Sequence, residues 1–91
     1  MASSIEILPP AQKQFLKLGR PEAARILHYL ETRVAPLDDP SQLGQALADN
    51  LAGLWRYRVG DYRVICRITV ADNRVSTVTV VAVRHRREIY K

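Results

Sequence analysis

The sequence contains little that would support a metal site, a disulfide or a membrane span. Its 91 residues include one cysteine, Cys66, and two histidines, His28 and His85. A single cysteine cannot form an internal disulfide, and this set of thiol and imidazole groups makes a zinc site a poor interpretation. No apolar run is long enough to cross a bilayer, and the first residues lack the basic start and apolar stretch of a signal peptide. We therefore expect a cytoplasmic protein with neither a metal nor a cofactor.

Acidic residues are scarce relative to basic ones, nine against fourteen, which gives a formal net charge of +5. This balance favours nucleic acid, an anionic surface or an acidic protein as the partner, without choosing among them. Eleven of the basic residues are arginine, whose planar guanidinium suits bidentate phosphate recognition and base stacking. The arginine content tilts the interpretation toward nucleic acid.

The order of local patterns predicts a single small α+β domain over residues 1–91. Prolines open both predicted helices, where a missing N–H costs nothing, and the second helix carries an apolar stripe at helical spacing. The predicted elements are a strand at 4–8, a helix at 11–18, a helix at 21–35, a loop at 37–53 with one weak helical turn at 45–48, and strands at 54–59, 62–70 and 75–83. We expect the last three strands to form an antiparallel meander packed on the helical hairpin.

The stretch LWRYRVGDYRVICRI, residues 54–68, predicts a hairpin closed by the two-residue loop Gly60-Asp61. Such a loop sets the register, so that Arg58 faces Arg63. Alternation then separates the side chains. One face, a predicted core, holds Trp55, Tyr57, Val59, Tyr62, Val64, Cys66 and Ile68, and the other, an arginine face, holds Leu54, Arg56, Arg58, Arg63, Ile65 and Arg67.

A second two-residue loop at 72–73 extends this register to the next strand. It predicts that Arg67 faces Val78, Ile65 faces Val80 and Arg63 faces Ala82, and that Arg84 joins the arginine face. The arginines would then surround an apolar floor of Ile65, Val78 and Val80, which suggests a protein partner as well as a phosphate ligand. A single bulge would change the side on which Arg84 lies. The alternative is a solvated face whose arginines pair with local carboxylates, with the apolar floor covered by the protein's own tail.

The chain ends in the basic segment RHRREIYK, residues 84–91. A basic cluster that closes with a tyrosine can hold a phosphodiester and offer an ionisable hydroxyl or a stacking ring. The other interpretation is a solvated terminal tail.

The motifs W-R-x-R-x-G-x-Y-R at 55–63 and H-R-R-E-x-Y at 85–90 together resemble the RelE branch of the RelE/ParE toxin superfamily. The resemblance implies the toxin of a type II toxin–antitoxin system, a metal-independent endoribonuclease that cleaves mRNA in the ribosomal A site by attack of the 2′-hydroxyl. It also implies a co-expressed antitoxin as partner. The catalytic positions implied are Arg56, Arg58, Arg63, Arg84 and Tyr90. From the arginine face, the basic tail and the apolar floor themselves, we expect RNA-binding positions at Arg67, His85, Arg86 and Arg87 and antitoxin-binding positions at Ile65, Val78 and Val80.

The sequence departs from the best-known RelE pattern, in which lysine occupies one or both positions matching Arg56 and Arg58. Arginine stays charged and cannot exchange a proton as a tuned lysine does. We expect Arg56 and Arg58 to orient the phosphate, while Tyr90 or His85 handles a proton and His85 can instead act in positioning or stacking. Two other functions stay open: a ParE-like DNA gyrase poison and a non-catalytic basic binding module.

Overall fold

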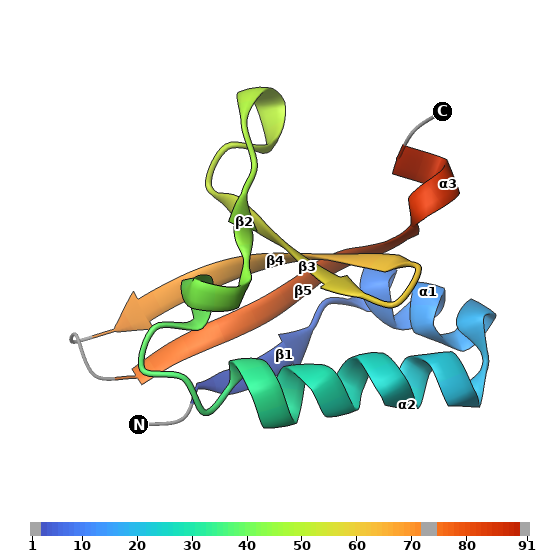
Figure 1. The fold of residues 1–91 in the computed structure, drawn as a ribbon, viewed down its shortest axis with the longest axis horizontal. Helices are drawn as coiled ribbons and strands as arrows, with labels where there is room; N and C mark the ends of the chain where they lie inside the picture. Colours follow the sequence, from blue (N-terminus) through green and yellow to red (C-terminus); the bar gives the residue numbers. More distant parts are fainter. Residues whose placement is uncertain (1–2, 72–74, 90–91) are drawn as a thin grey trace.

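The computed structural model describes residues 3–71 and 75–89, with side chains at 3–70 and 77–87, and its centre is a five-stranded mixed sheet in the order β1-β5-β4-β3-β2 (Figure 1). β1 pairs with β5 in parallel, and the other neighbours pair antiparallel. The strands are β1 (Ser4–Ile7), β2 (Gln45–Ala46), β3 (Leu54–Val59), β4 (Tyr62–Ala71) and β5 (Val75–His85). The predicted α+β class and the antiparallel meander are confirmed.

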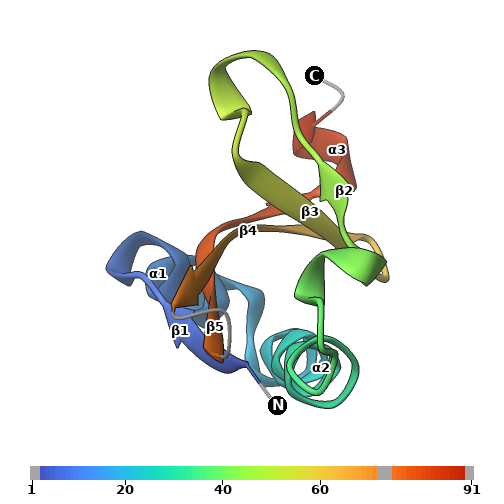
Figure 2. The ribbon, with the colours of Figure 1, turned by 90° about the vertical axis from the view of Figure 1, so that its left-hand side faces the viewer.

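Two helices cover one face of this sheet and leave the other face open. α1 (Pro9–Leu18) and α2 (Arg20–Tyr29), which continues as a π-helical turn over Leu30–Val34, lie together on one side (Figures 1 and 2). Gly19, with φ 86°, separates them, a backbone conformation that favours glycine. On the open side, the segment that includes β2 and the short α3 (Arg86–Ile89) both project away from the sheet. No helix in the described ranges is long and apolar enough to span a membrane.

The core lies between the helices and the sheet. The hairpin register is as predicted, with Arg58 opposite Arg63 across β3 and β4. The predicted alternation places Tyr57, Val59, Val64 and Cys66 among the buried residues. The buried core cluster comprises Ala11, Phe15, Ile26, Leu30, Val34, Tyr57, Val59, Val64, Cys66, Val78, Val80 and Val83.

The first part of β5 presents the opposite face from the one predicted. The predicted turn at 72–73 lies outside the described residues, but Ala71 pairs with Val75, one position away from the register that a two-residue loop would set. A shift of one residue exchanges the two faces of a strand. Val78 and Val80 are therefore fully buried in the core, and the prediction that they form an accessible floor for an antitoxin is wrong.

β5 then contains one extra residue, Val81, at a β-bulge. The pairs on either side are Cys66 with Val80 and Ile65 with Ala82. This second shift restores the predicted alternation, so Arg84 lies on the arginine face, directly opposite Arg63. The individual predicted pairs are nevertheless displaced, because Arg67 faces Thr79, Ile65 faces Ala82 and Arg63 faces Arg84.

The buried side chain of Tyr57 anchors the segment of chain that connects the second helix to β3. The Tyr57 hydroxyl donates a hydrogen bond to the Pro40 carbonyl oxygen at 2.7 Å. Gly44 passes so near this ring that a Cβ there would lie 3.2 Å from Tyr57 Cζ. The chain then forms β2 by pairing Gln45 with Arg56, so the predicted helical turn at 45–48 is wrong. These contacts hold residues 40–46 beside β3.

We expect Cys66 to be chemically inert in the folded protein. It is fully buried, and burial raises the pKa of its thiol from 9.0 to about 12. Because the thiolate is the reactive form, a thiol reagent at pH 8 should modify Cys66 only after unfolding. The folded state holds the thiol proton more tightly than the unfolded state does. The stabilisation of the fold by the protonated thiol is therefore complete below pH 9 and is lost as the pH rises toward 12.

The measurement is the rate of modification with and without denaturant. Fast modification of the native protein would contradict the buried position of Cys66, and the variant Cys66→Ala provides the blank.

Candidate functional site

Three arginines lie side by side across the open face of the sheet. Arg58 on β3 pairs with Arg63 on β4, which pairs in turn with Arg84 on β5. We call these three residues the arginine row. Neighbouring strands are about 4.8 Å apart, and like charges directly opposite one another destabilise a sheet. The row therefore concentrates positive charge where folding alone would avoid it.

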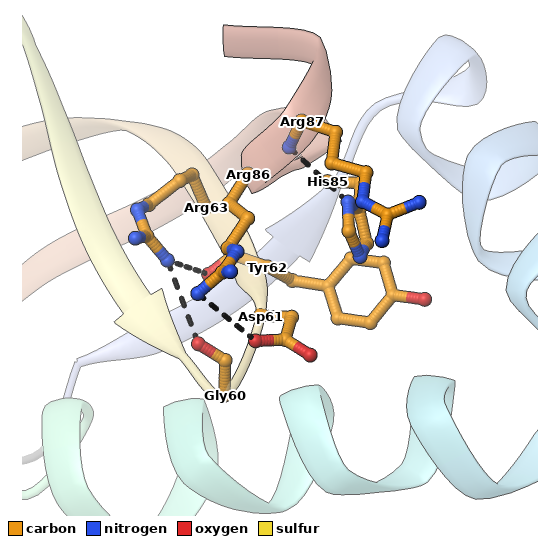
Figure 3. A network of polar contacts seen from close by, with 7 residues as sticks. All are labelled: Gly60, Asp61, Tyr62, Arg63, His85, Arg86 and Arg87. Atoms are coloured by element: carbon orange, nitrogen blue, oxygen red, sulfur yellow. Dashed lines mark hydrogen bonds and ion pairs between the residues drawn. The ribbon is translucent and has the colours of Figure 1, made fainter. Parts of the chain in front are cut away.

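Arg63, in the middle of the row, is a buried cation with 5% relative exposure. Its Nη1 is 3.5 Å from the Gly60 carbonyl oxygen and 3.3 Å from that of Tyr62, both at the long end of hydrogen-bond distances (Figure 3). Its Nε has no hydrogen-bond partner, and no described carboxylate forms an ion pair with it. An arginine held in this way retains unsatisfied capacity to bind an anion.

A groove of about 430 Å³ lies on the same face, with Arg56 and Arg84 at its lining. Arg56 Nη2 donates to Gln45 Oε1 on β2, and Arg84 Nη1 donates to the Val83 carbonyl oxygen at 3.3 Å. The apolar part of the lining comes from Leu47, Leu51, Leu54, Ile65, Val81 and Ala82. The groove thus combines cationic side chains with an apolar floor, as the sequence indicated, although different residues of β5 supply that floor.

The start of α3 is attached to the β3–β4 turn. The Arg86 backbone N–H donates to the Asp61 carbonyl oxygen at 2.8 Å, and its Nη1 lies 3.9 Å from Asp61 Oδ1 (Figure 3). Both side chains of this ion pair are largely exposed, so the backbone bond is the firmer connection. These contacts fix the direction in which the chain leaves the sheet after His85.

His85 lies on the opposite face of the sheet from the arginine row. It pairs with Tyr62, whose ring it meets edge to face at a centroid distance of 5.3 Å and an interplanar angle of 87° (Figure 3). It shares a small cavity with Gln14 and Leu18 of α1, and its Nδ1 accepts a hydrogen bond from the Arg87 N–H at 3.2 Å. The described arrangement keeps His85 away from any phosphate bound to the row, so a proton-transfer role for it there is not supported.

The structure brings together part of the site predicted from the sequence. Arg56, Arg63 and Arg84 lie on the open face at or beside the groove, and Ile65 contributes to its floor.

Other predicted site residues lie away from the groove. Arg58 belongs to the row but lines a second cavity next to α2. Arg67 is exposed further along β4, opposite Thr79, and does not line the groove. Tyr90 lies outside the described residues.

Sequence reasoning missed the apolar side chains that the segment before β3 adds to the groove. Leu47 and Leu51 line it together with Leu54. Their spacing of four and three residues would indicate a helix, which this segment does not form, so the sequence held no usable signal for them. Among the described residues, no group of three or more His, Cys, Asp or Glu side chains could hold a metal ion. The described chemistry of the groove is therefore charge stabilisation and apolar contact.

Residues 5–90 match a protein family described as the ParE toxin of the type II toxin–antitoxin system parDE. Among curated proteins, none matches this sequence. Several solved structures share its fold. One is the toxin–antitoxin complex RelBE2 from Mycobacterium tuberculosis, with a TM-score of 0.81 and 24% identity, covering 94% of this chain and 93% of that one.

Two further solved structures are similar over nearly the whole chain. The archaeal RelE–RelB complex from Pyrococcus horikoshii has a TM-score of 0.58 and 24% identity, with coverage of 94% of this chain and 97% of that one. The YoeB/ParE toxin from Agrobacterium tumefaciens has a TM-score of 0.58 and 17% identity, with coverage of 90% and 97%. At these identities the structures establish a shared fold.

Replacing Arg63 by methionine should leave the protein as stable as the parent or make it more stable, by about 1 kcal/mol. The reason is that burial of a cation without a carboxylate partner costs free energy that an apolar side chain of similar length does not. The measurement is the free energy of unfolding from urea denaturation. A loss of more than about 2 kcal/mol would show that Arg63 makes net stabilising contacts and would contradict this interpretation.

The exposed Arg67 on the same strand is the matched control, and Arg67→Met should change stability by no more than about 0.5 kcal/mol.

Inorganic phosphate should raise the melting temperature of the parent protein more than that of Arg63→Met, because only the parent keeps the buried guanidinium.

Proposed function

Because this chain belongs to the RelE/ParE superfamily of toxins from type II toxin–antitoxin systems, we propose that it is an endoribonuclease that cleaves mRNA in the ribosomal A site. The observation that carries the proposal is the arginine row, in which a buried Arg63 without a described carboxylate partner lies between Arg58 and Arg84. This charge accumulation has a physical reason if the natural ligand is a phosphodiester.

The reaction that fits these groups is attack of a ribose 2′-hydroxyl on its adjacent phosphate. A bond forms between the 2′-oxygen and phosphorus, and the bond from phosphorus to the 5′-oxygen breaks, which leaves a 2′,3′-cyclic phosphate and a 5′-hydroxyl. Negative charge builds up on the phosphoryl oxygens in the transition state. Guanidinium groups held in place by the sheet stabilise that charge without reorganising, and this is the role proposed for Arg63, Arg84 and Arg56.

Proton transfer needs one group to accept the 2′-hydroxyl proton and another to donate to the departing 5′-oxygen. The resemblance to RelE-type toxins implies Tyr90 as a participant. His85, the other residue considered for proton transfer, lies on the opposite face of the sheet, so Tyr90 is the remaining candidate from the sequence. Arg56 and Arg58 stay charged, so they act by orienting and neutralising the phosphate.

The antitoxin is proposed as the second ligand of the open face. The RelBE2 structure is described as a toxin–antitoxin complex, and the Pyrococcus structure as a complex of RelE with RelB. The groove beside the row combines Ile65, Val81 and Ala82 with cationic side chains, which suits an amphipathic segment that carries acidic residues. A basic toxin and an acidic antitoxin would associate rapidly through charge steering.

The second candidate is a DNA gyrase poison. The observation in its favour is that the matching family is described as the ParE toxin. This activity would use the basic surface for protein binding and would not need the arginine row to stabilise a transition state. A non-catalytic basic module that keeps the fold is the third interpretation.

We expect Arg84→Ala to slow cleavage of ribosome-bound mRNA by about 100-fold to 1000-fold, the typical loss when one preorganised donor to a transition-state charge is removed. Primer extension in a reconstituted translation system gives the cut position and rate, with the same mRNA free of ribosomes alongside. The exposed Arg20 on α2 supplies the control Arg20→Ala, which removes an equal charge and should cleave at the parent rate.

Intact mRNA in the presence of a folded, growth-inhibiting parent protein would overturn the nuclease proposal. Inhibition of gyrase supercoiling under those conditions would establish the second candidate. Growth inhibition that survives alanine at both Arg63 and Tyr90 would also contradict the catalytic roles.

A further inference from the structure

A second basic cavity, of about 390 Å³, lies where α2 meets the β3–β4 turn. Its arginines come from three elements: Arg25 from α2, Arg33 from the π-helical turn that follows, and Arg58 from β3. This cavity shares none of its lining with the apolar groove. We call it the α2 pocket.

Few described carboxylates offset the charge of the α2 pocket. Glu22 Oε2 lies 3.7 Å from Arg25 Nη1, in a partly exposed pair worth little in water. Asp61 in the adjacent turn is paired with Arg86 instead. Arg33 and Arg58 form no ion pair with any side chain that the structure describes. The pocket therefore carries a net positive charge.

The backbone of the β3–β4 turn lies close to the Arg25 side chain. Gly60 has φ 59°, and a Cβ at this position would lie 3.4 Å from Arg25 Nη1. The Arg25 guanidinium thus lies against the backbone of the turn, although 35 positions separate it from Gly60 in the chain. Arg58 lines the α2 pocket and also begins the arginine row, whose central residue Arg63 is buried.

We infer that the α2 pocket binds phosphate groups in the backbone of folded RNA, as a docking surface separate from the strand that is cut. Three guanidinium forks suit phosphate oxygens, and arginines contributed by α2, the π-helical turn and β3 match a polyanion with regularly repeated charges. The inference rests on the proposed function, in which the mRNA substrate is bound to the ribosome. It adds the surface of this protein that binds the RNA of the ribosome.

The test compares two double variants that lose the same charge. Arg25→Gln with Arg33→Gln alters the α2 pocket, and Lys13→Gln with Arg20→Gln is the control on exposed helical positions outside the pocket. All four side chains are exposed, so both proteins should melt within a few degrees of the parent, as checked by circular dichroism. Arg58 is left unchanged because it belongs to the arginine row.

Binding to purified ribosomes and to a fluorescent double-stranded RNA hairpin is measured over a series of salt concentrations. The pocket variant should bind about fivefold to thirtyfold more weakly than the control. The slope of log affinity against log salt should fall by about 1 for each phosphate that the variant no longer binds, or about 2 in all. At saturating protein, its cleavage rate should equal that of the control.

Equal affinities and equal salt slopes for the two double variants would overturn the inference, as would a parent protein that binds neither probe. A parent that binds ribosomes yet leaves mRNA intact would refute the nuclease proposal alone, while the comparison of variants would still test the α2 pocket. Competition by polyglutamate as effective as that by unlabelled RNA would also overturn it, in favour of an acidic protein segment.

Discussion

The open face of this protein depends on one extra residue in β5. Val78 and Val80 point into the core, and strict alternation from Val80 would direct Arg84 toward the core as well, beneath the helices. The bulge at Val81 reverses the alternation, so that Ala82 and Arg84 lie on the open face while Val83 remains buried. A bulge also increases local twist and redirects side chains. The same strand can therefore complete an apolar core in its first half and present a cation opposite Arg63 in its second half.

The arginine row that results is costly for folding. Its three positive charges lie on adjacent strands, and the central one is buried with an unpaired Nε. In a protein selected for stability alone, a carboxylate or an apolar side chain would be favoured at position 63. The structure instead spreads the supporting contacts over backbone carbonyls of the β3–β4 turn, which hold the guanidinium without neutralising it. The guanidinium therefore keeps an unused hydrogen-bond donor, and a cost to stability of this kind is typical of functional sites.

Local chemistry made much of this fold predictable. Gly60 and Asp61 specified the hairpin register because a two-residue loop leaves no freedom in pairing, and the apolar stripe of the second helix identified its buried side. The bulge at Val81 has no such signal, since it occurs in a uniform run of β-branched residues without glycine. β2 could not be predicted either, because Gln45 and Ala46 become a strand only through pairing with β3. The position of His85 could have been predicted, because alternation after Arg84 places it on the face opposite the row. It was missed because the terminal basic residues were treated as one cluster.

The two basic surfaces differ in what they can bind, and the arginine row contributes one residue to each, Arg84 to the groove and Arg58 to the α2 pocket. The groove is floored by aliphatic side chains, so a ligand there must bring apolar or planar groups as well as negative charge. The α2 pocket has three arginines and few carboxylates among the described side chains, so charge dominates its binding. A ligand that occupies the groove alone leaves Arg25 and Arg33 exposed, whereas a large polyanion can engage both surfaces at once. Under the proposal, the two surfaces would act as linked binding modules for such a ligand, with a joint affinity above that of either. Arg58, which lines the α2 pocket and pairs with Arg63 across β3 and β4, is the residue through which the pocket adjoins the row.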